Sequence, residues 1–142
     1  MTDIRALALE SLSLNNAPNR ERFLATMAPD CVWVTPDGEF HGREAIAAFQ
    51  RPFDRAFPDG EHTARRVLIE GDTVVIEGVW TGTHTGPLET PQGEVPPTGR
   101  RCESPFVVVA DIRDEQPARI NVYWDRLTMM AQLGLMEQPA AA

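Results

Sequence analysis

The order of two hydrophobic patterns constrains the fold of this chain most strongly. Up to about residue 57, apolar residues recur mainly three or four positions apart, as in amphipathic helices, with one short strand-like stretch at 31–35. After residue 60, β-branched residues and turn signals predominate, which is typical of antiparallel strands. Because helices and strands do not alternate along the chain, a parallel sheet built from βαβ units is not expected. The sequence therefore predicts an α+β fold.

The first half of the chain contains three predicted helices. An amphipathic stretch at 6–14 ends at the breaker Asn15-Asn16-Ala17-Pro18, and a second short helix follows with Asn19 as its N-cap. Apolar residues spaced three or four apart predict a third helix at 43–57. Pro52 lies inside this pattern, so we expect the third helix to be kinked or divided there.

The second half of the chain contains two predicted strand pairs. Strands at 62–70 and 73–83 flank the turn Gly71-Asp72, and strands at 101–112 and 119–127 flank a second polar turn. A last helical turn is predicted at 129–135.

A proline- and glycine-rich segment at 85–99 separates the two strand pairs. This segment is long for a loop in a compact domain, which favours a lid over a pocket. Its prolines restrict the backbone, which favours a rigid rim instead. The sequence leaves both interpretations open.

Length and charge limit the class of protein. With 142 residues, the chain is expected to form one domain over 1–142, with a core at about 5–135 and a frayed alanine-rich end. A formal net charge of −8 argues against a nucleic-acid partner, because phosphate backbones are bound by cationic surfaces. The sequence shows neither a signal-peptide pattern nor an apolar run of about 20 residues. We therefore expect a cytoplasmic protein that does not enter the membrane.

Motifs for metal or cofactor chemistry are not recognisable in the sequence. His41, His62 and His84 lie far apart, and Cys31 and Cys102 have no near partner and are interpreted as reduced thiols. The sequence contains no phosphate-binding Gly-Lys loop and no dinucleotide fingerprint. An activity without metal or cofactor is expected.

Three segments together resemble the SnoaL-like polyketide cyclases, within the superfamily of folds similar to nuclear transport factor 2. These segments are WTGTHTGPL at 80–88, PTGRR at 97–101, and YWDRL at 123–127 followed by QLG at 132–134. The resemblance spans roughly residues 20–135. It implies a cone of curved antiparallel sheet over three N-terminal helices, with an apolar pocket inside.

The resemblance also implies a reaction and a catalytic residue. In the characterised cyclases, an aspartate near the end of the last long strand is the general acid and base of an aldol ring closure, and Asp125 matches that position. We expect Asp125 to be largely buried, with its pKa raised by desolvation, because burial disfavours the charged carboxylate. The alternative is that Asp125 pairs with an arginine such as Arg126 or Arg101, or caps the C-terminal helix. Strand alternation places Asn121 and Tyr123 on the same face as Asp125. Tyr123 is then a candidate donor to the enolate oxygen, and Asn121 a candidate substrate contact.

Other candidate site residues are His84 and four aromatic side chains. His84 is a candidate for orienting the substrate or polarising its carbonyl, although a histidine in such a turn can equally well satisfy the loop backbone. Trp33, Phe49, Phe53 and Trp80 are candidate substrate contacts that line the cavity, although they can also be ordinary core.

The predicted function is acid–base chemistry next to a carbonyl of a hydrophobic, polyketide-like molecule, most plausibly a ring closure. The same fold also supports isomerases, dehydratases and epoxide hydrolases. The chain lacks the first-helix tyrosine of the steroid isomerases, and it also lacks the polar first-helix partner of some cyclases. The alternative from another class is a non-catalytic binding or dimerisation module. Because many members of this superfamily pair through the sheet, the resemblance implies a homodimer in either case.

Overall fold

The computed structural model describes residues 3–136. Four α-helices and one short 3₁₀ helix are present: α1 (Ile4–Ser13), η1 (Ala17–Asn19), α2 (Arg20–Thr26), α3 (Arg43–Ala56) and α4 (Arg126–Gln132). Eight strands complete the described part: β1 (Val32–Thr35), β2 (Gly38–His41), β3 (Glu61–Glu70), β4 (Thr73–Thr83), β5 (Leu88–Thr90), β6 (Gly93–Val95), β7 (Arg101–Arg113) and β8 (Gln116–Trp124). The predicted α+β class is confirmed. The expected fraying of the alanine-rich end lies outside the described residues.

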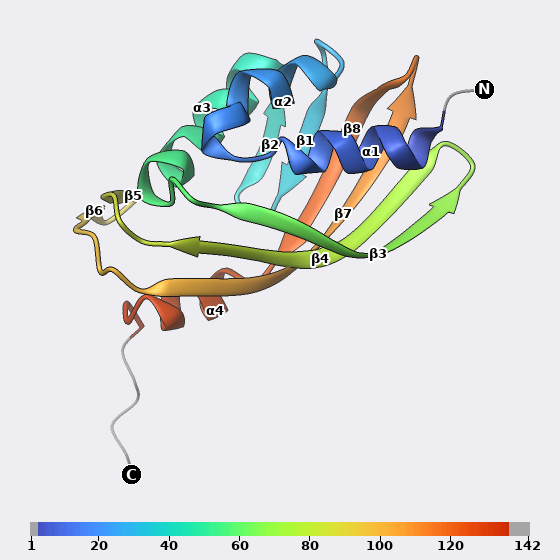
Figure 1. The fold of residues 1–142 in the computed structure, drawn as a ribbon. Coiled ribbons are helices and arrows are strands. Elements are labelled where there is room, and N and C mark those ends of the chain that lie inside the picture. Colours follow the sequence, from blue (N-terminus) through green and yellow to red (C-terminus); the bar gives the residue numbers. More distant parts are fainter. Residues whose placement is uncertain (1–2, 137–142) are drawn as a thin grey trace.

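The main sheet has six strands in the order β2-β1-β8-β7-β4-β3 (Figure 1). Its long strands β3, β4, β7 and β8 pair in antiparallel fashion, as predicted. Strand β1, however, pairs with β8 in parallel. The expectation of a purely antiparallel sheet is therefore wrong at this one pair. The long connection between β1 and β8 allows the two strands to run in the same direction.

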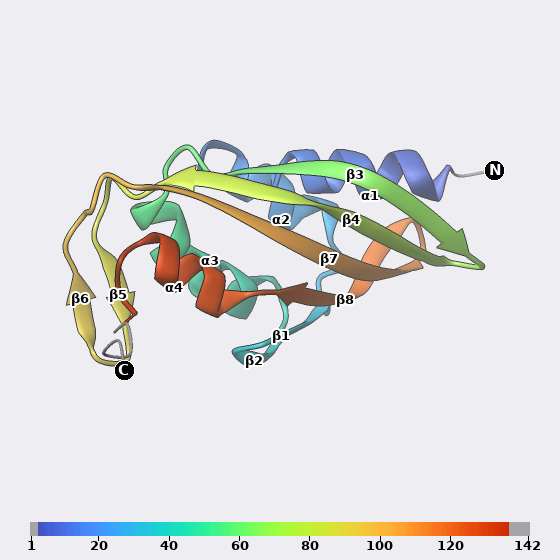
Figure 2. The ribbon, with the colours of Figure 1, turned by 90° about the horizontal axis from the view of Figure 1, so that it is seen from below.

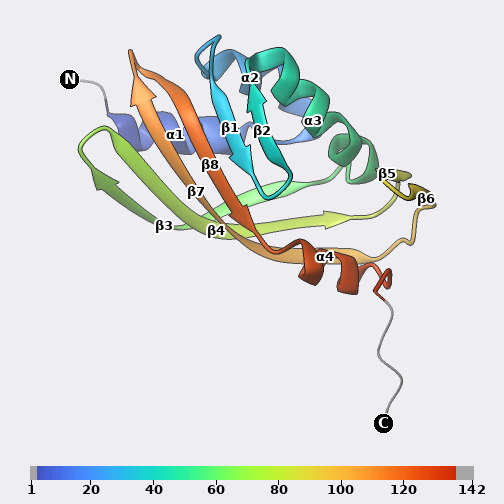
Figure 3. The same ribbon diagram turned by 180° about the vertical axis from the view of Figure 1, so that it is seen from behind.

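Three N-terminal helices cover one face of the curved sheet. Helices α1, α2 and α3 lie together on that side, and α4 follows β8 and packs beside the end of β7, where its Met129 also lines the pocket (Figures 1 and 3). Helix α3 runs without a break from Arg43 to Ala56 although it contains Pro52. The expected division of this helix is therefore wrong. The space between helices α1–α3 and the sheet is where the pocket lies.

Strand β2 was not predicted from the sequence. The strand-like stretch predicted at 31–35 corresponds to β1, whereas β2 begins at Gly38 and pairs with β1. Most of β2 is exposed and Phe40 is its only apolar residue besides glycine, so it carries no alternating hydrophobic pattern. Gly38 has a φ of +130°, a backbone conformation that glycine adopts without strain.

The segment at 85–99 contains a small hairpin rather than an irregular loop. Strands β5 and β6 pair with each other and lie beyond the end of α3, apart from the main sheet (Figure 2). The backbone N–H groups of Thr85 and Gly86 both donate to the carbonyl of Ala56, at 3.1 Å each. Leu88 is buried in a cluster with Phe57 and other apolar residues. The hairpin is thus attached firmly to the end of α3.

No helix in residues 3–136 is long and apolar enough to span a membrane.

Candidate active site

An apolar pocket of about 140 Å³ lies between the helices and the sheet. Aromatic side chains from both layers surround it, namely Phe23, Trp33, Phe49, Phe53, Trp80, Phe106 and Trp124. All three tryptophans of the chain are among them. The pocket is therefore suited to a flat hydrophobic molecule, because aromatic rings stack and pack edge to face against one another.

The four aromatic residues predicted as substrate contacts all line this pocket. Trp33 comes from β1, Phe49 and Phe53 from α3, and Trp80 from β4. Phe49 and Phe53 meet edge to face with 5.6 Å between ring centroids. Their position agrees with the expectation, whereas contact with a substrate remains a prediction.

Strand β8 turns its apolar residues toward the pocket. Ile120, Val122 and Trp124 line the cavity. By alternation, Asn121 and Tyr123 lie on the opposite, outer face of the sheet, where the Asn121 amide donates to the Tyr123 hydroxyl at 3.3 Å. The side chain of Tyr123 is 56% exposed. The shared face of these two residues was predicted correctly, but it is not the pocket face.

Asp125 lies outside the pocket and is exposed to solvent. It is the N-cap of α4, where its carboxylate accepts hydrogen bonds from the hydroxyl and the backbone N–H of Thr128. These hydrogen bonds stabilise the charged form, so the pKa of Asp125 is lowered. The expectation that Asp125 is buried with a raised pKa is therefore wrong. The strand also ends at Trp124, earlier than predicted, because this cap starts the helix at Arg126.

His84 is fully buried, but it does not line the pocket. Its Nδ1 accepts from the backbone N–H of Thr98 at 3.2 Å and lies 3.0 Å from the Thr98 hydroxyl. The backbone of His84 also pairs with Gly99 and Arg100. Two of the motifs that carried the family resemblance are thus joined by these hydrogen bonds, which indicates a structural function for His84. Burial lowers the pKa of His84.

His62 is the functional candidate that sequence reasoning missed. Its side chain lines the pocket, and it is the only acidic, basic or thiol side chain among the described residues that do so. Regular alternation counted back from the turn at Gly71 would point His62 outward. A bulge between Ala64 and Arg66 shifts the pairing by one residue and turns His62 inward, opposite Trp80. No sequence pattern marks this bulge, so only the structure reveals the position.

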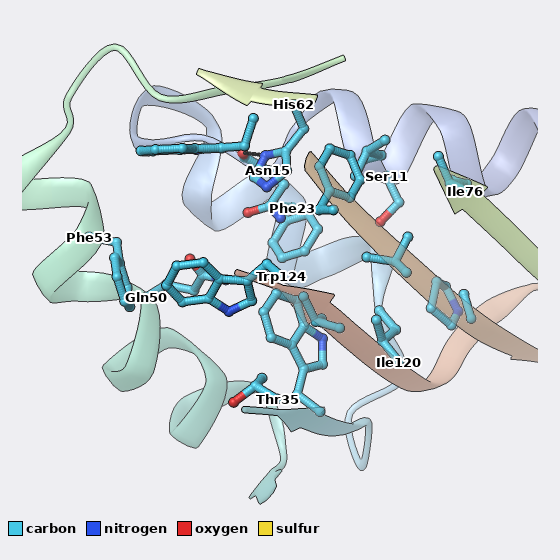
Figure 4. Close-up of a pocket in the computed structure, with 18 of the residues that line it drawn as sticks. Ser11, Asn15, Phe23, Thr35, Gln50, Phe53, His62, Ile76, Ile120 and Trp124 are labelled. Atoms are coloured by element: carbon cyan, nitrogen blue, oxygen red, sulfur yellow. Dashed lines mark hydrogen bonds between the residues drawn. The ribbon is translucent and has the colours of Figure 1, made fainter. Parts of the chain in front are cut away.

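The tautomer of His62 follows from its hydrogen bond. The ring Nδ1 lies 2.9 Å from the backbone carbonyl oxygen of Asn15, which can only accept, so Nδ1 carries the proton (Figure 4). Nε2 then has a free lone pair, and it has no hydrogen bond within residues 3–136. Burial, assisted by the charge of Arg20, lowers the pKa of His62 to about 4. The imidazole is therefore neutral at pH 7 and able to accept a proton.

A chain of polar contacts lies behind His62. Arg20, at the start of α2, donates to the side-chain oxygen of Asn15 at 2.7 Å. The same guanidinium makes two hydrogen bonds of 2.8 Å with the carboxylate of Asp54 on α3. Both charged side chains are largely buried, at 14% and 21% exposure. Such a bidentate pair fixes the geometry of its neighbours.

The remaining polar groups lie at two regions of the pocket wall. Figure 4 shows Asn15 and His62 together at one end, Thr35 at the opposite end and Trp124 between them. Ser11 also lines the pocket. Its hydroxyl donates to Thr26 at 2.7 Å, because the only hydroxyl proton of Thr26 is directed to the carbonyl of Phe23.

The 85–99 segment contributes no residue to the pocket lining. No group of three or more His, Cys, Asp or Glu side chains within the described chain is arranged to hold a metal ion. The pocket is thus lined mainly by apolar and aromatic side chains, with one titratable group, His62, at its polar end.

Comparison with known proteins identifies the family. Residues 10–120 match the SnoaL-like domain, and the chain belongs to that family. The fold is that of the superfamily similar to nuclear transport factor 2. No curated protein matches the sequence.

Solved structures share this fold over nearly the whole chain. AclR, a candidate hydroxylase from Streptomyces galilaeus, is 23% identical with a TM-score of 0.81, covering 96% of this chain and 89% of that one. IdmH, a candidate polyketide cyclase from Streptomyces antibioticus, is 26% identical with a TM-score of 0.79, covering 94% and 99%. A candidate SnoaL-like polyketide cyclase from Jannaschia sp. CCS1 is 23% identical with a TM-score of 0.78, covering 96% and 98%.

Proposed function

We propose that this protein is a cofactor-independent enzyme that binds a flat, polyketide-like molecule and moves a proton at a carbon next to a carbonyl. The observation that carries this proposal is the single neutral histidine, His62, in a pocket whose walls are aromatic. The names of the similar structures, two of them candidate polyketide cyclases, support the substrate class.

The proposed reaction begins with removal of a proton by Nε2 of His62. The C–H bond breaks, its electron pair moves into the adjacent carbonyl to form an enolate, and the imidazole becomes an imidazolium. In a ring closure, the enolate carbon forms a bond with a second carbonyl carbon of the same molecule. The alkoxide that results takes the proton back from His62, which restores the neutral ring.

The low pKa of His62 favours an activated substrate. A base with a pKa of about 4 removes protons efficiently only from carbon acids whose anions are well stabilised. A methylene group flanked by two carbonyls, as in a polyketide chain, has this property. Desolvation in the pocket also strengthens every polar interaction with the developing charge.

The base in this proposal is His62 rather than Asp125. The general acid–base function that the family resemblance implied for Asp125 has no support from its position, because its carboxylate caps α4 at the protein surface. Likewise, Tyr123 and Asn121 lie outside the pocket.

The outer face of the sheet supports a homodimer. Across β3, β4, β7 and β8 it carries an apolar set that includes Leu68, Val75, Val107, Val109 and Tyr123, and Leu68 and Tyr123 are 55% and 56% exposed. Glu77 and Arg66 form an ion pair within this set, and the apolar side chains around them are costly to leave in water. We propose that two copies pair through it.

Deuterium exchange tests the enzymatic proposal without knowledge of the natural substrate. 2-Tetralone is a flat ketone whose C1 protons are activated by both the carbonyl and the fused aromatic ring. It is incubated with the protein in D₂O at pH 7, and loss of the C1 proton signals is followed by NMR. Wild-type protein is expected to accelerate exchange, and His62→Gln to lower that acceleration by about 100-fold or more. Acceleration that is equal in both proteins would overturn the assignment of the base. If the ketone binds without accelerated exchange, the protein is a binding module instead.

A further inference from the structure

Asn15 occupies a junction between the base and the buried ion pair. It follows α1 directly, is 8% exposed, and lines both the main pocket and a smaller cavity beside it. Its backbone carbonyl accepts the Nδ1–H of His62 at 2.9 Å. The same residue therefore sets the tautomer of the base and presents a side chain to the pocket.

The orientation of the Asn15 amide is fixed by Arg20. The side-chain atom of Asn15 that faces Arg20 lies 2.7 Å from a guanidinium nitrogen. Because a guanidinium can only donate, this atom is the oxygen, and the amide nitrogen Nδ2 is turned away from Arg20. Asp54 holds the guanidinium in place through two hydrogen bonds of 2.8 Å.

The donor capacity of Nδ2 is unused within the protein. Neither of its two N–H groups makes a hydrogen bond to any residue in the described part, 3–136. Nδ2 is not among the fully enclosed polar atoms that lack a partner, so it faces open space where water or a ligand can complete its hydrogen bonds. If Asn15 served only to hold His62 in place through its backbone carbonyl, it would not need a free side-chain N–H group beside the pocket.

We propose that Asn15 is a second catalytic residue, whose Nδ2 donates a hydrogen bond to the carbonyl oxygen of the substrate. This inference rests on the proposed function. While His62 Nε2 removes the proton from the adjacent carbon, the negative charge that develops on the oxygen is stabilised by the Asn15 N–H. Arg20 and Asp54 are positioning residues, since they hold this amide without touching the substrate.

This arrangement defines the part of the substrate that the polar end recognises. His62, with a free acceptor at Nε2, and Asn15, with a free donor at Nδ2, lie beside each other on the pocket wall (Figure 4). They are matched by a carbonyl oxygen and an acidic C–H on the carbon next to that carbonyl. A hydrocarbon of the same shape would leave the amide without a partner and bind more weakly.

A pair of isosteric probes tests this inference. 2-Acetylnaphthalene carries the carbonyl, and 2-isopropenylnaphthalene replaces its oxygen with a methylene group. Binding is followed by the NMR signals of the three indole N–H groups, since all three tryptophans line the pocket. We expect wild-type protein to bind the ketone about five- to tenfold more tightly than the alkene, the value of one hydrogen bond.

The decisive variant is Asn15→Asp, and the matched control is Gln92→Glu. Aspartate keeps the acceptor that faces Arg20 and the backbone carbonyl that faces His62, but it has no N–H to donate. Gln92 is exposed in the turn between β5 and β6 and does not line the pocket, so the control changes an amide to an acid with the same change in charge away from the site. Asn15→Asp is expected to abolish the preference for the ketone, and Gln92→Glu to retain it.

A readout in the wild-type protein makes the test independent of how the variant folds. The side-chain amide signals of Asn15 are expected to shift downfield with the ketone and to stay in place with the alkene. Equal affinity of wild-type protein for the two probes, without that shift, would overturn the assignment of Asn15 and leave the proposed function standing. If neither probe perturbs the indole signals, the pocket does not accept flat aromatic molecules, and the proposed function fails as well.

Discussion

His62 on β3 faces Trp80 on β4 across the pocket side of the sheet, and a bulge between Ala64 and Arg66 is what turns it there. In a regular hairpin His62 would point to the outer face, where a histidine is easily solvated. The bulge instead buries the ring and lowers its pKa to about 4.

Burial of His62 gives stability a dependence on pH with a definite sign. The folded protein holds this pKa near 4, whereas the unfolded chain has an ordinary value near 6.5. Between these values the unfolded state binds the extra proton, so stability is full above pH 6.5 and falls as the pH approaches 4, by about 3 kcal/mol from this group. Urea unfolding at pH 7, 5 and 4 should show this extra loss in wild-type protein and not in His62→Gln. Parallel curves for the two proteins would contradict it.

Asp125 is expected to matter for stability and not for proton transfer. Asp125→Ala removes the N-cap of α4 and should lower the melting temperature by a few degrees. Asp125→Asn keeps a capping oxygen and should melt close to the wild type. Both variants are expected to retain accelerated deuterium exchange with 2-tetralone. Loss of exchange in Asp125→Asn, with the melting temperature unchanged, would restore the aspartate as the base.

The hairpin β5–β6 is expected to be a fixed support rather than a lid. A Cβ at Gly86 would lie 1.9 Å from the carbonyl oxygen of Arg55, so Gly86→Ala must displace the hairpin from α3. We expect a loss of about 1–3 kcal/mol in the free energy of unfolding. Thr85→Ala, at an exposed neighbour, serves as the control. Because no residue of 85–99 lines the pocket, affinity for 2-acetylnaphthalene should be unchanged, and a large change would indicate a lid after all.

The outer face of the sheet is expected to mediate self-association. Val109 lies on this face between Val75 of β4 and Asn121 of β8. Val109→Arg should convert a dimer to a monomer in sedimentation experiments, with the fold and the pocket retained, because a buried unpaired charge at an interface is costly. Ala48→Arg, at an exposed position of α3 on the helix side of the sheet, adds the same charge away from this face and is the control. A wild-type protein that sediments as a monomer at all concentrations would contradict the proposed dimer.

The fold could be predicted from sequence far better than the site. The strand at 73–83 was predicted with its observed limits, because its β-branched residues alternate and its turn is clear. The aromatic residues that line the pocket were also identified, because large apolar side chains on helices and strands are usually buried. The six-strand order with a parallel β1–β8 pair depends on contacts between distant segments and leaves no local pattern.

The polar residues of the site depend on features that the sequence does not express. Asp125 carries the family motif, yet its side chain is used by the helix that follows, because Thr128 lies three residues ahead at capping distance. His62 depends on one bulge, and Asn15 depends on an arginine and an aspartate from other helices. Family resemblance located the domain correctly but could not decide which way each polar side chain points.

Nitrogen NMR of His62 tests the central claim most directly. Protein labelled with ¹⁵N in its histidine rings is titrated from pH 8 to the lowest pH at which it stays folded, with His62→Gln used to assign the signals. We predict that His62 remains neutral through pH 5, with the proton on Nδ1 and the lone pair on Nε2. A ring that titrates near 6.5, or one that carries its proton on Nε2, would contradict the account, because the pocket would then lack the neutral base on which the proposed chemistry depends.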